Sequence, residues 1–133
     1  MTRINLVPPE SLHPKHLMAE IHEITRVFGL VRAFDLRMST EDLSLYSEYK
    51  MGKGHVKFFY NKLGFLVDRY RELCTHAISI GWKINPIDSS ILVRGIPGKY
   101  LGNFLPKRKD IFVNLERLIE KNKEHYGDRE IGK

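Results

Sequence analysis

The first group with distinctive chemistry is the backbone amine of residue 2. Because Thr2 is small, we expect the initiator Met1 to be removed, which exposes the Thr2 α-amine. An α-amine has a pKa of about 7.7–8.0, against about 10.4 for lysine, so roughly a tenth of it is neutral at pH 7. A neutral amine can attack a sugar or carbonyl carbon and form an imine. Chain ends are also commonly frayed and inert, so this amine alone leaves the question open.

A ridge of cations is the second such feature, on a helix expected from about Leu12 to Arg32. At about 100° per residue, Lys15 and His22 fall within roughly 40° of Arg26. Glu23 lies on the flank of this ridge, and the apolar stripe of the helix lies opposite. We therefore expect a cationic solvent face with a single carboxylate beside it.

A second pair of cations lies on a helix expected from about Lys109 to Tyr126. Arg117 and Lys121 are spaced i, i+4 and face away from the apolar side. Both basic faces also have the character of ordinary solvated helix surfaces. A glutamate among cations is commonly an ion-pair partner worth under ~1 kcal/mol. Geometry alone does not separate these interpretations.

Metal and disulfide chemistry are not expected. None of the six histidines pairs with another at i, i+4. The single cysteine, Cys74, cannot supply the several thiolate ligands of a typical structural zinc site, and it has no partner for an internal disulfide. Gly52-Lys53-Gly54 lacks the spacing of a phosphate-binding loop. We expect no cofactor.

Three segments with helical periodicity must position these groups, because each carries an apolar stripe. The stripes are Leu17, Ile21, Ile24, Phe28 and Val31; Phe59, Leu63, Leu66, Tyr70, Leu73 and Ala77; and Ile111, Leu115, Leu118 and Ile119. Pro14 suits the first turn of the first helix. The second helix is expected from about Val56 to Ile80, with Gly81 at its C-terminal cap, and Gly127 ends the third.

The connecting segments carry weaker signals. Residues 39–42 are typical of a cap for a short helix that reaches Tyr46. Ile91-Leu92-Val93 is the one strand-like run. We predict an all-α, compact single domain over residues 1–133, with three main helices and long connecting loops.

Composition sets the broad class. The chain has 133 residues, 42% of them hydrophobic, which suffices for one core. With 22 Lys and Arg against 16 Asp and Glu, the net charge of +6 weakly favours a polyanionic partner. Neither a membrane-length apolar run nor a signal peptide is present, so we expect a soluble, cytoplasmic monomer.

Three blocks of the sequence resemble the pyrimidine-dimer DNA glycosylase family, also called endonuclease V of phage. The first includes Met1-Thr2-Arg3-Ile4-Asn5-Leu6, His16-Leu17-Met18-Ala19-Glu20, Glu23 and Arg26-Val27-Phe28-Gly29. The second is Gly54-His55-Val56, Phe58-Phe59-Tyr60, Lys62-Leu63 and Phe65-Leu66, and the third is Arg117-Leu118 with Glu120-Lys121. The resemblance covers nearly the whole chain.

The resemblance implies a bifunctional DNA-repair enzyme, a glycosylase and abasic-site lyase, in a bacterium or a virus-infected host cell. Its N-terminal segment threads between helices, and its amine attacks the anomeric carbon of a damaged nucleotide in duplex DNA. A Schiff base forms, and β-elimination then cuts the strand. The matching catalytic positions are Thr2 and Glu23. The matching positions on the DNA-binding surface are Arg3, His16, Arg26, Arg117 and Lys121, with Lys15 and His22 on the same face.

Two departures from the family pattern concern the substrate. The best-known members carry arginine where this chain has His22, and glutamine where it has Lys15. Their aromatic C-terminal cluster is reduced here to Tyr126-Gly127. The same chemistry on ring-opened purines or abasic sites, and a catalytically idle binder of bent or damaged DNA, therefore stay open as alternatives.

Overall fold

A computed structural model describes residues 4–38 and 41–127, and every regular element in these ranges is helical. The all-α prediction is confirmed. The α-helices are α1 (Pro14–Leu36), α2 (His55–Phe58), α3 (Leu63–Ser79), α4 (Ser89–Leu92), α5 (Arg108–Lys121) and α6 (Lys123–Tyr126). The 3-10 turns are η1 (Pro9–Ser11), η2 (Leu43–Tyr46) and η3 (Gly98–Tyr100).

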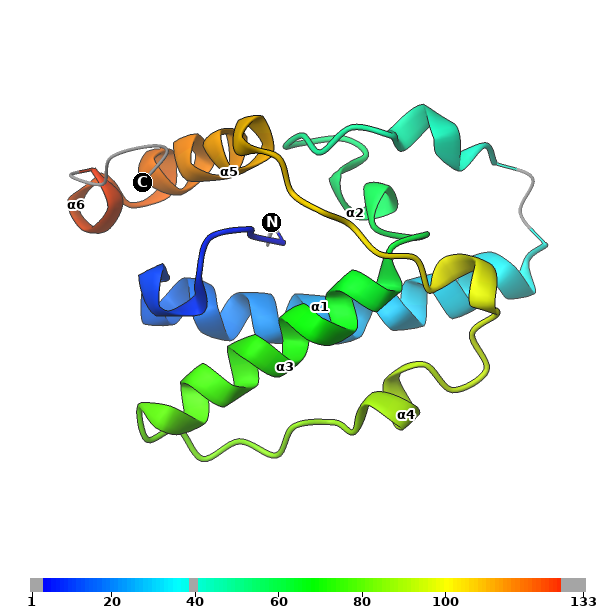
Figure 1. Ribbon diagram of the computed structural model, residues 1–133, viewed down its shortest axis with the longest axis horizontal. Coiled ribbons are helices and arrows are strands. Elements are labelled where there is room, and N and C mark those ends of the chain that lie inside the picture. The colour runs from blue at the N-terminus through cyan, green and yellow to red at the C-terminus, as the bar shows by residue number, and fades with distance from the viewer. Residues whose placement is uncertain (1–3, 39–40, 128–133) are drawn as a thin grey trace.

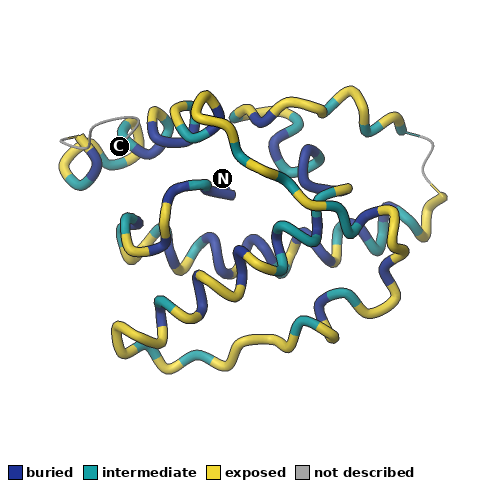
Figure 2. The backbone as a smooth tube through the Cα atoms, viewed as in Figure 1, coloured by how far each residue is buried: buried dark blue, intermediate teal, exposed yellow. Residues whose placement is uncertain are grey.

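The two longest helices, α1 and α3, pack against each other in the middle of the molecule, between α5 and the chain around α4 (Figure 1). The start of the described chain runs between α1 and α5, antiparallel to α1, before it turns through η1 (Figure 1). This threaded arrangement is the one that the resemblance implies. The backbone of this segment is largely buried (Figure 2).

Helix α1 forms as its sequence predicts. Pro14 occupies the first turn, and the Nδ1 atom of His13 accepts a hydrogen bond from the Lys15 backbone N–H at 3.1 Å. All five residues of the predicted apolar stripe are buried. Burial of each such side chain contributes about 1.5–3 kcal/mol. The helix continues to Leu36, four residues beyond the expected end.

The second predicted helix is wrong as a continuous element, because it is interrupted between α2 and α3. Phe58, Phe59 and Tyr60 are all buried. Three consecutive residues on one helix span about 200°, so a straight helix would expose at least one of these rings. A turn through residues 59–62 brings all three inside. Gly81 has φ +96° just after α3, as its predicted capping position requires.

Two further predictions need correction. The third helix ends at Lys121 and restarts at Lys123, because Asn122 has an extended backbone with φ −154°. Residues 91–93 do not form a strand. Instead Asp88 Oδ1 accepts a hydrogen bond from the Ser90 N–H at 2.9 Å and starts the short helix α4. The predicted short helix near Tyr46 is the 3-10 turn η2.

Candidate functional site

The N-terminal segment is fixed by hydrogen bonds along its described part, from Ile4 to Val7. The Oδ1 atom of Asn114 on α5 accepts from the backbone N–H of Leu6 at 2.7 Å and of Val7 at 3.3 Å. The Val7 carbonyl accepts from Nη1 of Arg69 on α3 at 2.6 Å. Two helices from different parts of the chain therefore hold one short stretch of backbone.

A buried polar network extends this attachment to α1. Asn5 donates from Nδ2 to Glu20 at 2.9 Å and accepts from Asn114 Nδ2 at 2.7 Å. Glu20 is fully buried and forms an ion pair with Arg69, with Nε and Oε2 2.7 Å apart. A buried ion pair is stable only when its remaining hydrogen-bonding groups also have partners. Asn5 and the Val7 carbonyl are such partners, so the network is complete only when the N-terminal segment occupies this one position. We name Asn5, Glu20, Arg69 and Asn114 the anchor network.

Ile4 is held separately by the loop that precedes α2. Its N–H donates to Nε2 of His55 at 2.9 Å, and its carbonyl accepts from the Tyr49 hydroxyl at 2.8 Å. All three residues are buried. Both backbone polar groups of Ile4 are thus bonded, two residues after Thr2. Thr2 and Arg3 themselves lie outside the described residues.

Glu23 lies on α1 one turn after Glu20, and it is more buried than predicted. It lies on the flank of the cationic ridge, next to Arg26, but only 8% of the residue is exposed, which the helical geometry did not predict. Its Oε1 accepts from Arg26 Nη1 at 3.2 Å, and the Arg26 side chain is 60% exposed. Arg26 is the one hydrogen-bonding partner of Glu23 within the described ranges. A carboxylate so enclosed has little water to stabilise its charge and is suited to stabilise a nearby cation.

The predicted cations occupy α1 and α5, the two helices that flank the N-terminal segment (Figure 1). Lys15, His22 and Arg26 are exposed on α1, and Lys121 is exposed on α5. Arg117 is half-buried and donates from Nη1 to Glu120 at 3.3 Å. Its Nε is buried and has no hydrogen-bond acceptor within residues 4–38 and 41–127.

His16 is less exposed than the neighbouring cations because α6 packs against it. Its Nδ1 is 2.8 Å from the Tyr126 hydroxyl, which also accepts from the His13 N–H at 2.8 Å. Burial, followed by the charges of His13, Lys15, His125 and Lys121, lowers the pKa of His16 below 6.5. Tyr126 is fully buried, so the remaining C-terminal aromatic supports His16 rather than forming an exposed surface.

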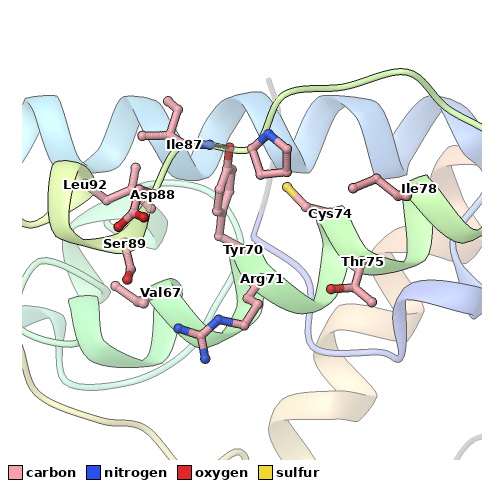
Figure 3. A pocket seen from close by; sticks show the side chains of 11 residues that line it. Val67, Tyr70, Arg71, Cys74, Thr75, Ile78, Ile87, Asp88, Ser89 and Leu92 are labelled. Carbon is pink, nitrogen blue, oxygen red and sulfur yellow. Dashed lines mark hydrogen bonds between the residues drawn. The ribbon is translucent and has the colours of Figure 1, made fainter.

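Two pockets lie on different sides of the molecule. One of about 470 Å³ adjoins Arg26 and includes His55, Lys57 and Tyr60 in its wall. The other, of about 420 Å³, lies between α3 and the chain around α4 (Figure 3). None of the predicted site residues lines this second pocket, and burial raises the pKa of the thiol of Cys74 in its wall, so the thiol stays protonated.

The anchor network was not predicted, although the sequence contains a pattern that marks three of its members. Glu20, Arg69 and Asn114 each lie on the apolar face of their predicted helix, because each follows one apolar stripe residue by three positions and precedes another by four. A polar residue at such a position must be paired inside the core. Opposite charges on two stripes and an amide on the third predict a shared buried network.

Two negative findings apply to the described residues. They contain no group of three His, Cys, Asp or Glu side chains that could hold a metal ion. Within the same ranges, no helix combines the length and the apolar character needed to cross a membrane.

The fold and site together define a class. This is a small all-α protein whose segment from Ile4 to Val7 is anchored by hydrogen bonds, with a buried carboxylate on α1 and cations on α1 and α5. Such an arrangement is suited to a polyanionic substrate. A family model described as pyrimidine dimer DNA glycosylase matches residues 1–90 of the 133. The chain belongs to this family and is therefore a DNA-repair glycosylase that acts on DNA. Helix α5, which carries Arg117 and Lys121, lies beyond the matched region.

Proposed function

We propose that the protein excises pyrimidine dimers from double-stranded DNA and then cuts the strand at the resulting site by lyase chemistry. In this proposal the chain acts as a monomer and as a single domain over residues 1–133. The family supplies the glycosylase activity, and the lyase step follows from the use of an amine nucleophile.

The proposed reaction begins with attack by the neutral Thr2 α-amine on the anomeric carbon. The bond to the damaged base breaks, the base leaves with the electron pair and gains a proton, and the amine loses a proton. Opening of the sugar ring gives an imine between the amine nitrogen and C1′. Removal of a proton from C2′ then expels the 3′ phosphate by β-elimination, and water hydrolyses the imine to release the enzyme.

Glu23 has two roles in this scheme. The sugar acquires positive charge as the base departs, and a fixed carboxylate stabilises such an oxocarbenium-like state. Glu23 then accepts and returns protons at the imine stage. Its burial favours both roles, because an electrostatic interaction is stronger where water is excluded.

The observation that carries the proposal is the fixed backbone from Ile4 to Val7. Two residues span at most about 7 Å, so the tether limits how far the Thr2 amine can move from Ile4. A nucleophile held in this way avoids most of the entropy loss of a free chain end. The fixed backbone from Ile4 to Val7 therefore favours a positioned Thr2 amine, whereas an inert terminus would need no such attachment.

The cations would hold the DNA backbone on either side of this centre. They are Arg3, Lys15, His16, His22, Arg26, Arg117 and Lys121. Contacts to phosphate position the enzyme without reading sequence, and they make affinity depend on salt. Lys15, His22, Arg26 and Lys121 are exposed, which is consistent with such contacts.

The test is strand cutting by Glu23→Gln on duplexes that contain a pyrimidine dimer, an abasic site or a ring-opened purine. Glu23→Gln should abolish cutting and leave DNA affinity nearly unchanged, whereas Glu116→Gln, an exposed control on α5, should behave as the parent. Cutting by Glu23→Gln at the parent rate would refute the role of the carboxylate. The duplex that the unsubstituted protein cuts fastest identifies its lesion. If the unsubstituted protein cuts none of the three duplexes, it is a catalytically idle DNA binder.

A further inference from the structure

His55 is a buried imidazole that the proposed chemistry does not use. Only 2% of the residue is exposed, and it lies at the first position of α2. Its Nε2 is 2.9 Å from the Ile4 nitrogen, and its Nδ1 is 3.0 Å from the Lys50 carbonyl oxygen. The ring therefore links the N-terminal segment to the loop before α2.

These two contacts determine the protonation state of the ring. A backbone N–H can only donate, so Nε2 must carry a lone pair, and a carbonyl can only accept, so Nδ1 must carry the proton. The neutral Nδ1–H tautomer is the one form that satisfies both. A protonated ring would direct an N–H at the N–H of Ile4 and break that hydrogen bond.

The surroundings of His55 favour the neutral ring. The Tyr49 and Phe59 rings pack on it with centroids 5.4 and 5.7 Å away. The charged groups that share the wall of the adjoining pocket are all cations, and no described carboxylate lines it. They are Arg26 on α1, Lys53 in the preceding turn and Lys57 on α2. Lys57 is also bonded to Glu41, with both oxygens 2.8 Å away, and Arg26 to Glu23.

We propose that His55 is a positioning residue whose neutral ring holds Ile4 and thereby limits how far the Thr2 amine can move during the proposed reaction. Protonation of Nε2 by solvent breaks this bond, frees the start of the chain and stops imine formation. The inference rests on the proposed function of the Thr2 amine. It makes the enzyme sensitive to acid through a group that never touches the DNA.

Two substitutions at this position separate the two hydrogen bonds of the ring. In His55→Gln the side-chain oxygen reaches the position of Nε2 and accepts from Ile4 at any pH. In His55→Asn the amide nitrogen replaces Nδ1 as donor to the Lys50 carbonyl, but no acceptor reaches Ile4. His76→Gln, on the distant helix α3, serves as the histidine control.

The kinetic test measures single-turnover imine trapping by borohydride on abasic-site DNA, at saturating protein, as the pH falls. The parent must lose protons from both Thr2 and His55, so the logarithm of its rate should approach a slope of two against pH. His55→Gln should show a slope of one, and His76→Gln a slope of two. His55→Asn should be at least about tenfold slower than the parent at neutral pH, as expected for a lost positioning bond.

A second readout does not depend on activity. Nitrogen NMR of the His55 ring should show the Nδ1–H tautomer at pH 7, and the Ile4 amide should lose its protection from hydrogen exchange in acid in the parent but not in His55→Gln. Equal slopes for the parent and His55→Gln, a parent-like rate for His55→Asn, or an Nε2–H ring would each overturn the inference. If the parent forms no adduct at any pH, the proposed function fails, and the NMR and exchange results alone decide the role of His55.

Discussion

Replacement of Asn114 by alanine tests whether α5 holds the N-terminal segment. Asn114 is fully buried and accepts from the N–H groups of Leu6 and Val7 while donating to Asn5. The substitution leaves two backbone donors and one amide oxygen without their partner. Each buried group of this kind costs about 1–3 kcal/mol, with the 3.3 Å bond to Val7 at the low end. We expect a total loss of about 3–7 kcal/mol.

The assay is thermal unfolding, followed by strand cutting at a temperature where the variant is fully folded. A domain of this size loses about 3–4 °C in Tm per kcal/mol, so Asn114→Ala should lower Tm by about 9–28 °C. Asn103→Ala, at an exposed asparagine, should change Tm by less than about 2 °C. Cutting by folded Asn114→Ala should fall about ten- to hundredfold, because the amine is less well positioned. Equal Tm changes for the two variants would refute the anchoring role.

Three further predictions concern other parts of the site. Arg69→Met should cost about 3–5 kcal/mol in unfolding free energy, because it leaves Glu20 without its cation and the Val7 carbonyl without this donor. Adding Glu20→Leu should restore part of the loss, although it also removes an acceptor of Asn5. No recovery in the double variant would show that the ion pair does not explain the cost. Arg117→Ala should reduce the slope of log affinity against log salt by about 0.9, whereas Arg71→Ala, on the far side, should leave the slope unchanged. The lowered pKa of His16 means that the folded protein favours the neutral ring, so its contribution to stability is full above about pH 6.5 and is lost as the pH falls through the folded-state pKa. His16→Gln should therefore flatten the decline of unfolding free energy in acid, and an unchanged decline would contradict this.

Local patterns in the sequence predicted α1 along most of its length and the main part of the other two long helices. The apolar stripe of α1 is buried over its length, and the cations opposite it are exposed, because one helical period determines both. Local patterns did not predict the break between α2 and α3. That break depends on the core accepting three consecutive aromatic rings, which is a tertiary effect.

The same distinction applies to the site. Helical geometry placed the exposed cations and also placed Glu23 on their flank, but it did not predict the burial of that carboxylate. Periodicity marks Glu20, Arg69 and Asn114 as polar residues on apolar stripes, but it does not show that they meet, because they come from three helices far apart in the chain. Their pairing follows only from the rule that a polar group inside a core needs a partner.

The central claim is that the chain start is the nucleophile, and mapping of the reduced DNA adduct tests it most directly. The protein, with Met1 removed, is trapped with borohydride on abasic-site DNA, digested and analysed by mass spectrometry. We predict a covalent bond at the Thr2 α-nitrogen and no adduct after selective acetylation of that amine. An adduct on a lysine side chain, or undiminished trapping by the acetylated protein, would contradict the account.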